Sequence, residues 1–343
     1  MPSSASWASN QAEFMKVVQI MGPKPVTLVH LSDPHLPMIG GLSPRHWTLK
    51  RTLGYLNWQC RRKAVFMSAP LDRLITDLMK QAPDHIAVTG DLVNLGLPAE
   101  LDAAERWLRA LGTGQDVSVV PGNHDIYVRL RRDQGVERWR EYMCSDAFGR
   151  EMMGDVACRV NGFPFVRKRG QVALIGLNSA VPTPPFVAAG ELGEAQIAGL
   201  RMVLPRLQRL GLVRVVLIHH PPLARQTSRR RGLRDARALE SVLRQYGADL
   251  VLHGHNHTNS LHWAEGPGGM IPILGIASAG TGSAKEGAGM LARYNLVRFW
   301  TEGEKRRIVV TGRGLAVPEG EIIELDCREV PLKGELTGAV AHD

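Results

Sequence analysis

The sequence has few cysteines and no long hydrophobic run, and each shortage excludes a class of protein. Its four cysteines, Cys60, Cys144, Cys158 and Cys327, are scattered, whereas a disulfide framework or a zinc knuckle needs closer spacing. No apolar stretch approaches the roughly eighteen residues of a membrane span. Residues 1–22 do not combine a basic stretch with an apolar block, so we expect no secretory signal. We therefore expect free thiols and a cytoplasmic protein.

Acidic residues are outnumbered by basic ones, 33 to 42, which gives a net charge of +9. The basic residues cluster at 45–63, 129–140 and 225–237. Such clusters favour an anionic partner, which could be a phosphorylated substrate, an acidic lipid surface or nucleic acid. The alternative is a solvated basic surface that only aids solubility.

Strand and helix patterns alternate along most of the chain. Short apolar runs predict strands at 25–32, 85–90, 117–120, 172–177, 213–218 and 249–252. Helical spacing predicts helices around 71–78, 101–111, 197–207 and 238–243, the last with Asp235 as its N-cap. After residue 270 we predict only strands, at 271–276, 294–299 and 307–310, with a hairpin near 301–305. This order predicts two sheets packed face to face with helices outside.

Five short motifs lie just past predicted strand ends. They are Asp33-Pro34-His35, Gly90-Asp91-Leu92-Val93-Asn94, Gly122-Asn123-His124-Asp125, His219-His220-Pro221-Pro222 and Gly254-His255-Asn256-His257. They offer carboxylates, imidazoles and amide oxygens, which suit Mn, Fe, Co or Zn. Seven or eight donors exceed the needs of one tetrahedral ion and fit two ions with a bridging carboxylate, an arrangement used to attack phosphorus. Strand ends are where open α/β sheets place their sites, and we expect the three motif glycines to allow tight turns there.

In this order, the motifs resemble those of the calcineurin-like metallophosphoesterase superfamily, from Asp33 to His257. The resemblance implies an α/β fold, a four-layer αββα sandwich of two mixed sheets flanked by helices. It also implies the roles of seven residues. Asp33, His35 and His257 would hold one metal, Asn123, His219 and His255 would hold the other, and Asp91 would bridge both together with a hydroxide. The expected cofactors are therefore two divalent ions, Mn, Fe, Zn or Co.

The resemblance further implies that His124 contacts the phosphate or assists the leaving group. Protein phosphatases of the superfamily carry Asp where this chain has Asn94, and an amide orients an imidazole less strongly. With Asn94, the motifs are most similar to bacterial class III cyclic-nucleotide and glycerophosphodiester phosphodiesterases. His219 and His220 are adjacent and point opposite ways on an extended chain, so only His219 is assigned to a metal. Asn94 and His220 are expected to orient groups or contact substrate, and Asp125 to orient its loop.

Asp91 follows His35 by 56 residues, which is more than compact members of the superfamily need. We therefore predict an insertion at about 40–68 within a metallophosphoesterase domain of residues 25–317, flanked by an N-terminal segment, 1–24, and a C-terminal tail, 318–343. Aromatic and basic residues alternate in the insertion. It could pack on the domain as a helical excursion, cap the active site, or contact an anionic membrane peripherally, as interfacial segments do.

We predict a dinuclear metal-dependent phosphodiesterase, in which a metal-bridging hydroxide hydrolyses a P–O bond. The expected substrate is a phosphorylated small molecule or a lipid-linked one, such as a cyclic nucleotide or a glycerophosphodiester, and nucleic acid is not expected. The expected location is the cytoplasm or the periphery of the inner membrane. One alternative is a pyrophosphatase of the UDP-diacylglucosamine type in lipid A synthesis. Another is a non-catalytic scaffold on the same fold, although scaffolds usually lose metal ligands that this chain retains.

Overall fold

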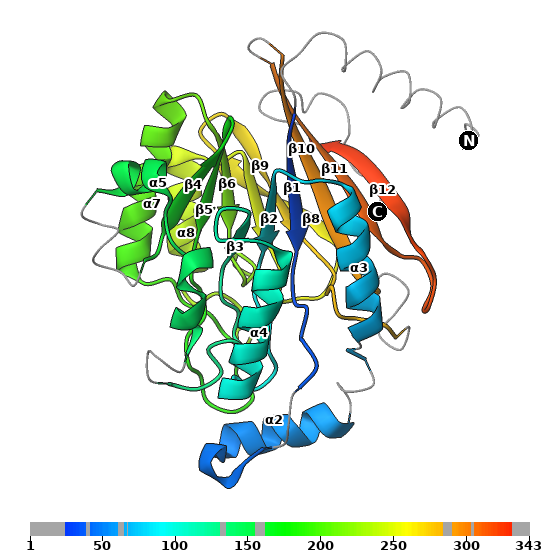
Figure 1. The fold of residues 1–343 in the computed structure, drawn as a ribbon. Helices are drawn as coiled ribbons and strands as arrows, with labels where there is room; N and C mark the ends of the chain where they lie inside the picture. The colour runs from blue at the N-terminus through cyan, green and yellow to red at the C-terminus, as the bar shows by residue number, and fades with distance from the viewer. Residues whose placement is uncertain are drawn as a thin grey trace.

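The computed structural model describes residues 25–38, 42–60, 65–66, 68–130, 135–154, 162–283, 290–302 and 305–330. These residues form two mixed six-stranded sheets with helices on the outer faces (Figure 1), so the predicted αββα layers are confirmed. The expected N-terminal segment, 1–24, and residues 331–343 of the expected tail lie outside the described residues. Among the described helices, none has the length and apolar character that crossing a membrane requires.

The first sheet joins three parallel strands to an antiparallel end. Its order is β12 (Ile322–Val330), β11 (Lys305–Leu315), β10 (Arg293–Glu302), β1 (Val26–Leu31), β2 (His85–Val88) and β3 (Val117–Val119). Helices α3 (Ser68–Lys80) and α4 (Pro98–Leu111) connect the parallel strands. Strands β10 and β11 pair antiparallel as far as Glu302 and Lys305, which confirms the predicted hairpin.

The second sheet has four parallel strands between two antiparallel edges. Its order is β4 (Phe165–Arg169), β5 (Val172–Gly176), β6 (Val213–Leu217), β7 (Leu250–His253), β9 (Gly269–Gly275) and β8 (Ser260–Gly266). Helix α7 (Glu194–Arg209) precedes β6, α8 (Ala236–Tyr246) precedes β7, and the short α5 (Ala147–Met153) precedes β4. All four predicted helices are present, as α3, α4, α7 and α8.

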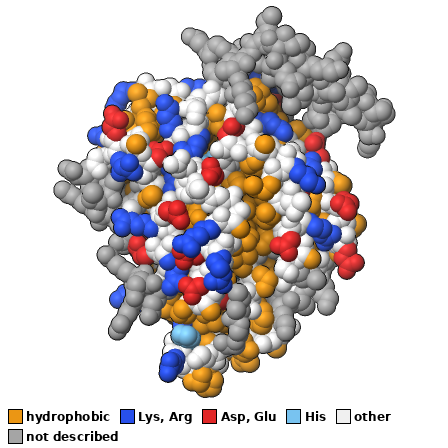
Figure 2. Space-filling model, viewed as in Figure 1, with side chains coloured by type: hydrophobic (Ala, Val, Ile, Leu, Met, Phe, Trp, Pro, Cys, Tyr) orange, Lys and Arg blue, Asp and Glu red, His pale blue; other side chains and the backbone are white. Residues whose placement is uncertain are grey.

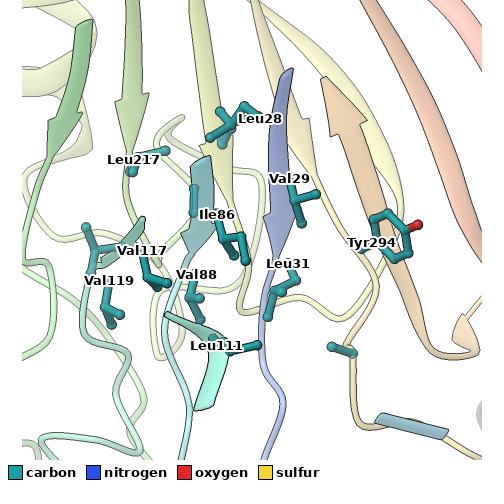
Figure 3. Packing of buried hydrophobic residues seen from close by; sticks show 14 of the residues in the cluster. Leu28, Val29, Leu31, Ile86, Val88, Leu111, Val117, Val119, Leu217 and Tyr294 are labelled. Atoms are coloured by element: carbon teal, nitrogen blue, oxygen red, sulfur yellow. The ribbon is translucent and has the colours of Figure 1, made fainter. Parts of the chain in front are cut away.

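Two hydrophobic layers hold the sandwich together. Leu28 and Val88 of the first sheet share one buried cluster with Leu217 of the second, between the two sheets (Figure 3). Val216, the neighbour of Leu217, instead belongs to the cluster beneath α7 and α8. Successive residues of a strand point to opposite faces, so a strand covered on both faces is apolar throughout. This explains why the inner strands were predictable as uninterrupted apolar runs.

The strands that sequence analysis missed, β4, β8 and β12, lie at sheet edges. Edge strands are partly exposed, and their polar residues hide the strand pattern; β12, for example, reads IIELDCREV. Strand β12 pairs with β11 from Ile322 opposite Leu315 to Val330 opposite Ile308. The sheet therefore continues past residue 317, where we expected the tail to begin.

Asp235 is not the side-chain cap that we predicted for α8. The residue stands at the N-cap position, but its carboxylate makes no capping hydrogen bond to that helix in the described structure. Its oxygens instead accept from the backbone N–H groups of Leu192, at 3.0 Å, and Gly193, at 2.8 Å, immediately before α7. The carboxylate thus ties two helices together, a contact between segments distant in sequence.

The described part of the expected insertion, 40–68, is largely helical. It contains a 3-10 turn, η1 (Pro44–His46), and α2 (Leu49–Cys60), which lies beyond one end of the sheets (Figure 1). Cys60 on this helix is a free thiol, as are Cys144 and Cys327, while Cys158 lies outside the described residues.

Candidate metal centre

All five motifs meet at one end of the sandwich, as predicted from their positions after strands. Asp33 and His35 follow β1, Asp91 follows β2, Asn123 and His124 follow β3, His219 follows β6, and His255 and His257 follow β7. Strands β1 to β3 run parallel in one sheet, and β6 and β7 run parallel in the other. The carboxyl ends of the parallel strands in both sheets therefore bring these side chains to a shared edge. Three groups there could hold metal ions: Asp33 with His35 and His257, Asp33 with Asp91 and His219, and His219 with His220 and His255.

Asp33, His35 and His257 form the first group of converging donor atoms. The Nε2 atoms of His35 and His257 lie 3.3 Å apart, and His257 Nε2 lies 3.2 Å from Asp33 Oδ1. Ligand atoms about 2.1 Å from one ion lie about 3.0–3.4 Å from each other. The spacing in this group is therefore that of a set of ligands around one cation.

Asn123, His219 and His255 form the second group. His219 Nε2 lies 3.2 Å from Asn123 Oδ1 and 3.2 Å from His255 Nδ1. All three residues are buried, and their spacing again matches ligands of a single ion.

Asp91 stands between the two groups. Its Oδ2 lies 3.4 Å from His219 Nε2 and 4.0 Å from His35 Nε2, so the same oxygen faces both sets of ligands. Its Oδ1 accepts a hydrogen bond of 2.7 Å from the backbone N–H of His124, which fixes the rotation of the carboxylate. This is the placement that a bridging carboxylate requires.

Backbone carbonyls orient two of the imidazoles toward the centre. His35 Nδ1 lies 3.2 Å from the Val93 carbonyl, and His219 Nδ1 lies 2.7 Å from the Thr89 carbonyl. A carbonyl can only accept, so each Nδ1 carries the hydrogen and donates it. The lone pair of each Nε2 is then available to a metal, which is how buried ligand histidines are commonly held.

The electrostatics of the site favour cation binding. Burial alone would raise the pKa of Asp33 and Asp91, but the neighbouring imidazoles lower it, for Asp91 well below its usual range. Although burial opposes the change, the charges of Asp91 and Asp33 raise the pKa of His219 to about 9. A cation bound to His219 Nε2 would replace that proton and satisfy both carboxylates.

The backbone is strained at five of the seven expected ligands. The φ angles are +52° at Asp33, +42° at His35, +55° at Asp91, +69° at His255 and +54° at His257. Each such conformation of a residue other than glycine costs about 1–3 kcal/mol and persists at functional sites that the surrounding fold enforces. The fold thus imposes this geometry against local preference.

The three motif glycines serve the site in two ways. Gly90 adopts a φ of +87°, a conformation that favours glycine. A Cβ at Gly122 would lie 2.2 Å from Asp91 Oδ1, and one at Gly254 would lie 2.4 Å from Asp33 Oδ2. Gly122 and Gly254 also begin turns, closed by the Asp125 N–H on the Gly122 carbonyl at 3.1 Å and by the Asn256 N–H on the Gly254 carbonyl at 2.8 Å. The predicted turns are therefore present, and at these two positions the missing side chain also leaves space for a carboxylate.

His124 is oriented differently from the expectation based on Asn94. The Asn94 side chain turns away and donates to the Leu36 carbonyl at 2.8 Å. The backbone carbonyl of Asn94 instead contacts His124 Nδ1, at 2.5 Å. On its other side, the His124 ring stacks on Tyr127 with centroids 5.5 Å apart. A backbone carbonyl and an aromatic ring hold this imidazole, so replacement of Asp by Asn does not leave it unsupported.

His220 and Asp125 support the surrounding loops. One ring nitrogen of His220 lies within 4.8 Å of ligand atoms of His219 and His255, but both of its nitrogens are bonded to protein, Nδ1 with Ser179 Oγ at 2.8 Å and Nε2 with the Ala188 carbonyl at 3.1 Å. Burial lowers its pKa to about 3, so the ring is neutral. The His219 and His220 rings lie edge to face with centroids 5.0 Å apart, so the expectation that they point opposite ways is wrong. What distinguishes His220 is that protein groups occupy both of its ring nitrogens.

The Asp125 carboxylate accepts four backbone hydrogen bonds of 2.8–3.2 Å, from Gly122, Asp91, Leu92 and Val93. Burial and the charge of Asp91 raise the Asp125 pKa to about 7, and the backbone N–H donors oppose this rise. The carboxylate joins the loop that carries Asp91 to the loop that carries Asn123, so the predicted role in loop orientation is confirmed.

Several supporting residues escaped sequence analysis. The Ser32 hydroxyl donates to Asp33 Oδ2 at 2.6 Å, and the Ser278 hydroxyl donates to the Asp33 carbonyl at 2.6 Å. The Phe66 ring lies 4.5 Å from the His35 ring. Ser32 could have been suspected because it precedes the first motif. The other two have no local signal, since only the fold brings them to the site.

Comparisons with known proteins agree with this architecture. The sequence profile described as calcineurin-like phosphoesterase matches residues 26–259. No curated protein sequence matches the chain. A dimetal phosphatase from Danio rerio has a similar structure, with a TM-score of 0.57, 14% identity, and 88% of this chain and 99% of that chain covered. A purple acid phosphatase from yellow lupin (Lupinus luteus) seeds has a TM-score of 0.50 and 12% identity, with 88% of this chain and 54% of that chain covered.

At such identities the solved structures establish likeness of fold alone. The family profile, in contrast, spans more than half of the chain and contains every motif that converges at the sheet edge. The chain therefore belongs to the calcineurin-like phosphoesterase family, whose members use a dinuclear divalent metal centre.

Proposed function

We propose that this protein is a metal-dependent phosphodiesterase. One cation would be held by Asp33, His35 and His257, the other by Asn123, His219 and His255, and both by Asp91. The observation that carries the proposal is the position of Asp91 Oδ2, which faces donor atoms of both groups at 3.4 Å and 4.0 Å. The shared oxygen and the two ligand-like clusters fit two divalent ions.

When bound, two such ions supply Lewis acidity toward phosphate oxygens and lower the pKa of water. The residues of the chain prepare the site for that chemistry. Asp33 and Asp91 are present as carboxylates because neighbouring imidazoles lower their pKa. Asn123 contributes a neutral oxygen, which limits the negative charge around the cations and leaves them more electrophilic.

His124 is the residue that we propose to move a proton. Its Nδ1 is directed to the Asn94 carbonyl, which leaves Nε2 as the atom to hold a proton toward the ester oxygen of the leaving group. The ring is only partly buried and lies edge-on to His35, with centroids 5.0 Å apart, beside the first cluster. General acid assistance of this kind contributes about 10²–10⁴-fold to rate.

A phosphodiester is the favoured substrate class because the Gly-Asp-x-x-Asn, His-His-Pro-Pro and Gly-His-Asn-His motifs are most similar to those of class III phosphodiesterases. A second candidate is a pyrophosphate bond in a lipid-linked nucleotide. Exposed Trp47, Leu49 and Leu56 of the segment around α2 favour it, since an amphiphilic substrate needs apolar surface beside the site. Either substrate is compatible with a cytoplasmic enzyme.

The test is a substrate panel with metal-loaded protein: bis-p-nitrophenyl phosphate, p-nitrophenyl phosphate, cAMP, a glycerophosphodiester and a UDP-linked diacylglucosamine. A phosphodiesterase prefers the first, third or fourth compound, and preference for the last supports the second candidate. Asp91→Asn keeps the shape of the side chain and should reduce bound metal to at most one equivalent with loss of turnover. Two tightly bound equivalents in Asp91→Asn would contradict the bridging role. A protein that binds two ions and hydrolyses none of the panel would support the scaffold alternative.

A further inference from the structure

Three surface segments form one continuous rim beside the candidate metal centre. We define the rim as residues 42–60, 179–190 and 220–234. Lys50 Nζ on α2 donates to Thr183 Oγ1 at 2.9 Å, which joins the first segment to the second. The N–H of Ala188 donates to the Arg230 carbonyl at 2.8 Å, which joins the second to the third. Arg231 also donates to the His255 carbonyl at 3.0 Å, so the rim borders the metal centre directly.

The rim contains cations and no acidic residue. Its basic residues are Arg45, Lys50, Arg51, Arg225, Arg229, Arg230, Arg231 and Arg234, and no Asp or Glu occurs in any of its three segments. Arg51 is buried, and Arg234 pairs with Glu191 just outside the rim. Glu240 of α8 also reaches the rim, where its Oε1 accepts from the Ala224 N–H. The remaining basic residues outnumber these two glutamates, so the rim is net positive and attracts an anionic partner.

The same rim exposes large apolar side chains. Trp47 is 63% exposed, Leu49 71%, Leu56 55% and Phe186 79%, and they are half of the large hydrophobic residues exposed in the described parts of the chain. In Figure 2, hydrophobic side chains gather at the lower tip, where Figure 1 places α2. Phe186 adopts a φ of +63°, which is rare for a bulky residue. A strained turn therefore presents its ring to solvent.

The outward face of α2 is fixed by contacts of its inner face. Arg51 donates to the Leu95 carbonyl at 3.1 Å and to the Gly96 carbonyl at 2.5 Å. Gly54 packs so closely that a Cβ there would lie 2.3 Å from the Tyr127 hydroxyl. The helix thus packs on the domain through Arg51 and Gly54, while Leu49 and Leu56 remain outside.

We propose that the rim docks this protein on an anionic lipid bilayer. Trp47, Leu49, Leu56 and Phe186 enter the headgroup layer, and Arg45 with the arginines of 225–231 contact lipid phosphates. Apolar side chains interleaved with cations are the chemistry of interfacial segments, and each basic residue near an anionic surface strengthens attachment. A nucleic acid would also match the positive charge of the rim, but it would leave the exposed leucines in contact with water. Docking places the metal centre next to the membrane, whatever ester it cleaves.

The experiment is co-sedimentation of the full-length protein with vesicles of phosphatidylcholine containing about one-third phosphatidylglycerol, compared with pure phosphatidylcholine. We expect binding to the anionic vesicles that weakens as salt increases. Leu49→Ser, Leu56→Ser and Phe186→Ser should each weaken partitioning by about tenfold, and Arg229→Ser by about fivefold. Leu210→Ser and Arg209→Ser are the matched controls, because these exposed residues lie at the end of α7, before β6 and thus at the opposite end of the sheet.

Thermal melts must show that the rim variants fold, and turnover of a soluble chromogenic diester should be unchanged in Phe186→Ser. Unchanged turnover with lost vesicle binding supports the proposal independently of the substrate. Equal vesicle binding by rim variants and controls would overturn it, as would absence of binding by the wild type at low salt. A dimer in sedimentation velocity that Leu56→Ser and Phe186→Ser abolish, without vesicle binding, would assign the apolar face to a second copy of the chain.

Discussion

Replacement of Gly254 by alanine should disable one metal site without altering any ligand. A Cβ at this position would lie 1.9 Å from Ser32 Oγ and 2.4 Å from Asp33 Oδ2. Unbonded heavy atoms need about 3.5 Å, so the Asp33 carboxylate must retreat by about 1 Å. Metal–ligand distances tolerate only about 0.2 Å. We expect affinity at the site of Asp33, His35 and His257 to fall by at least the 10–100-fold typical of lost ligand support.

Overpacking of this kind should also cost about 1–3 kcal/mol of unfolding free energy. The measurement is metal content by elemental analysis after dialysis against a weak chelator, together with urea unfolding of the metal-free protein. Gly232→Ala is the matched control, because a Cβ there meets its nearest atom, the Ser228 carbonyl oxygen, at 3.3 Å. Two retained metal equivalents and wild-type turnover in Gly254→Ala would refute the reasoning, since the carboxylate could then move without consequence.

Three further predictions concern the supports of the site and of the sheet. Asp125→Asn should cost about 2–4 kcal/mol in urea unfolding, because backbone N–H donors lose their carboxylate acceptor; a loss below about 0.5 kcal/mol would contradict this. Tyr127→Leu should lower kcat about 2–10-fold with metal content unchanged, because His124 loses its stacked ring. Tyr127→Phe keeps the ring and should behave like wild type. Equal kcat values in the wild type and both variants would contradict the stacking role. Asp77→Asn should cost about 1.5–3 kcal/mol at pH 7 and progressively less as pH falls below about 4. Burial opposes the shift, but hydrogen bonds from Arg313 lower the pKa of Asp77, so its contribution is present above pH ~4 and lost as pH falls through the lowered pKa; a pH-independent difference would argue against it.

Most inner strands and helices could be predicted because each carries its own signal. Strands such as β6 are buried on both faces and therefore apolar throughout, and helices such as α7 show apolar residues at helical spacing. Three of the four edge strands, β4, β8 and β12, could not be predicted in this way, whereas the fourth, β3, is buried and was predicted. Strand β12 is half-exposed and rich in charge, and its identity depends on pairing with β11. Edge strands carry a weaker pattern because only part of their surface is buried.

The candidate ligands were predictable for the same local reason: each stands in a short motif immediately after a strand. Their supports were not. The Asp235 carboxylate accepts from the Gly193 N–H before α7 rather than from an N–H of α8, the helix that it precedes. His124 is held by a carbonyl rather than by the Asn94 side chain, and Ser278 reaches the Asp33 carbonyl across 245 positions. A side chain of this kind has many possible partners, and nothing in the nearby sequence selects one of them.

The sequence by itself determined which chemical groups are present and that each follows a strand, because donor type and strand periodicity are local properties. Only the tertiary structure decided that one oxygen of Asp91 faces both clusters, that five of the seven candidate ligands adopt positive φ angles, and that α2 turns its apolar face outward. Those features arise from packing between segments far apart in the chain. Packing supplies the free energy that holds strained backbone and buried charge in place, and no local pattern encodes it.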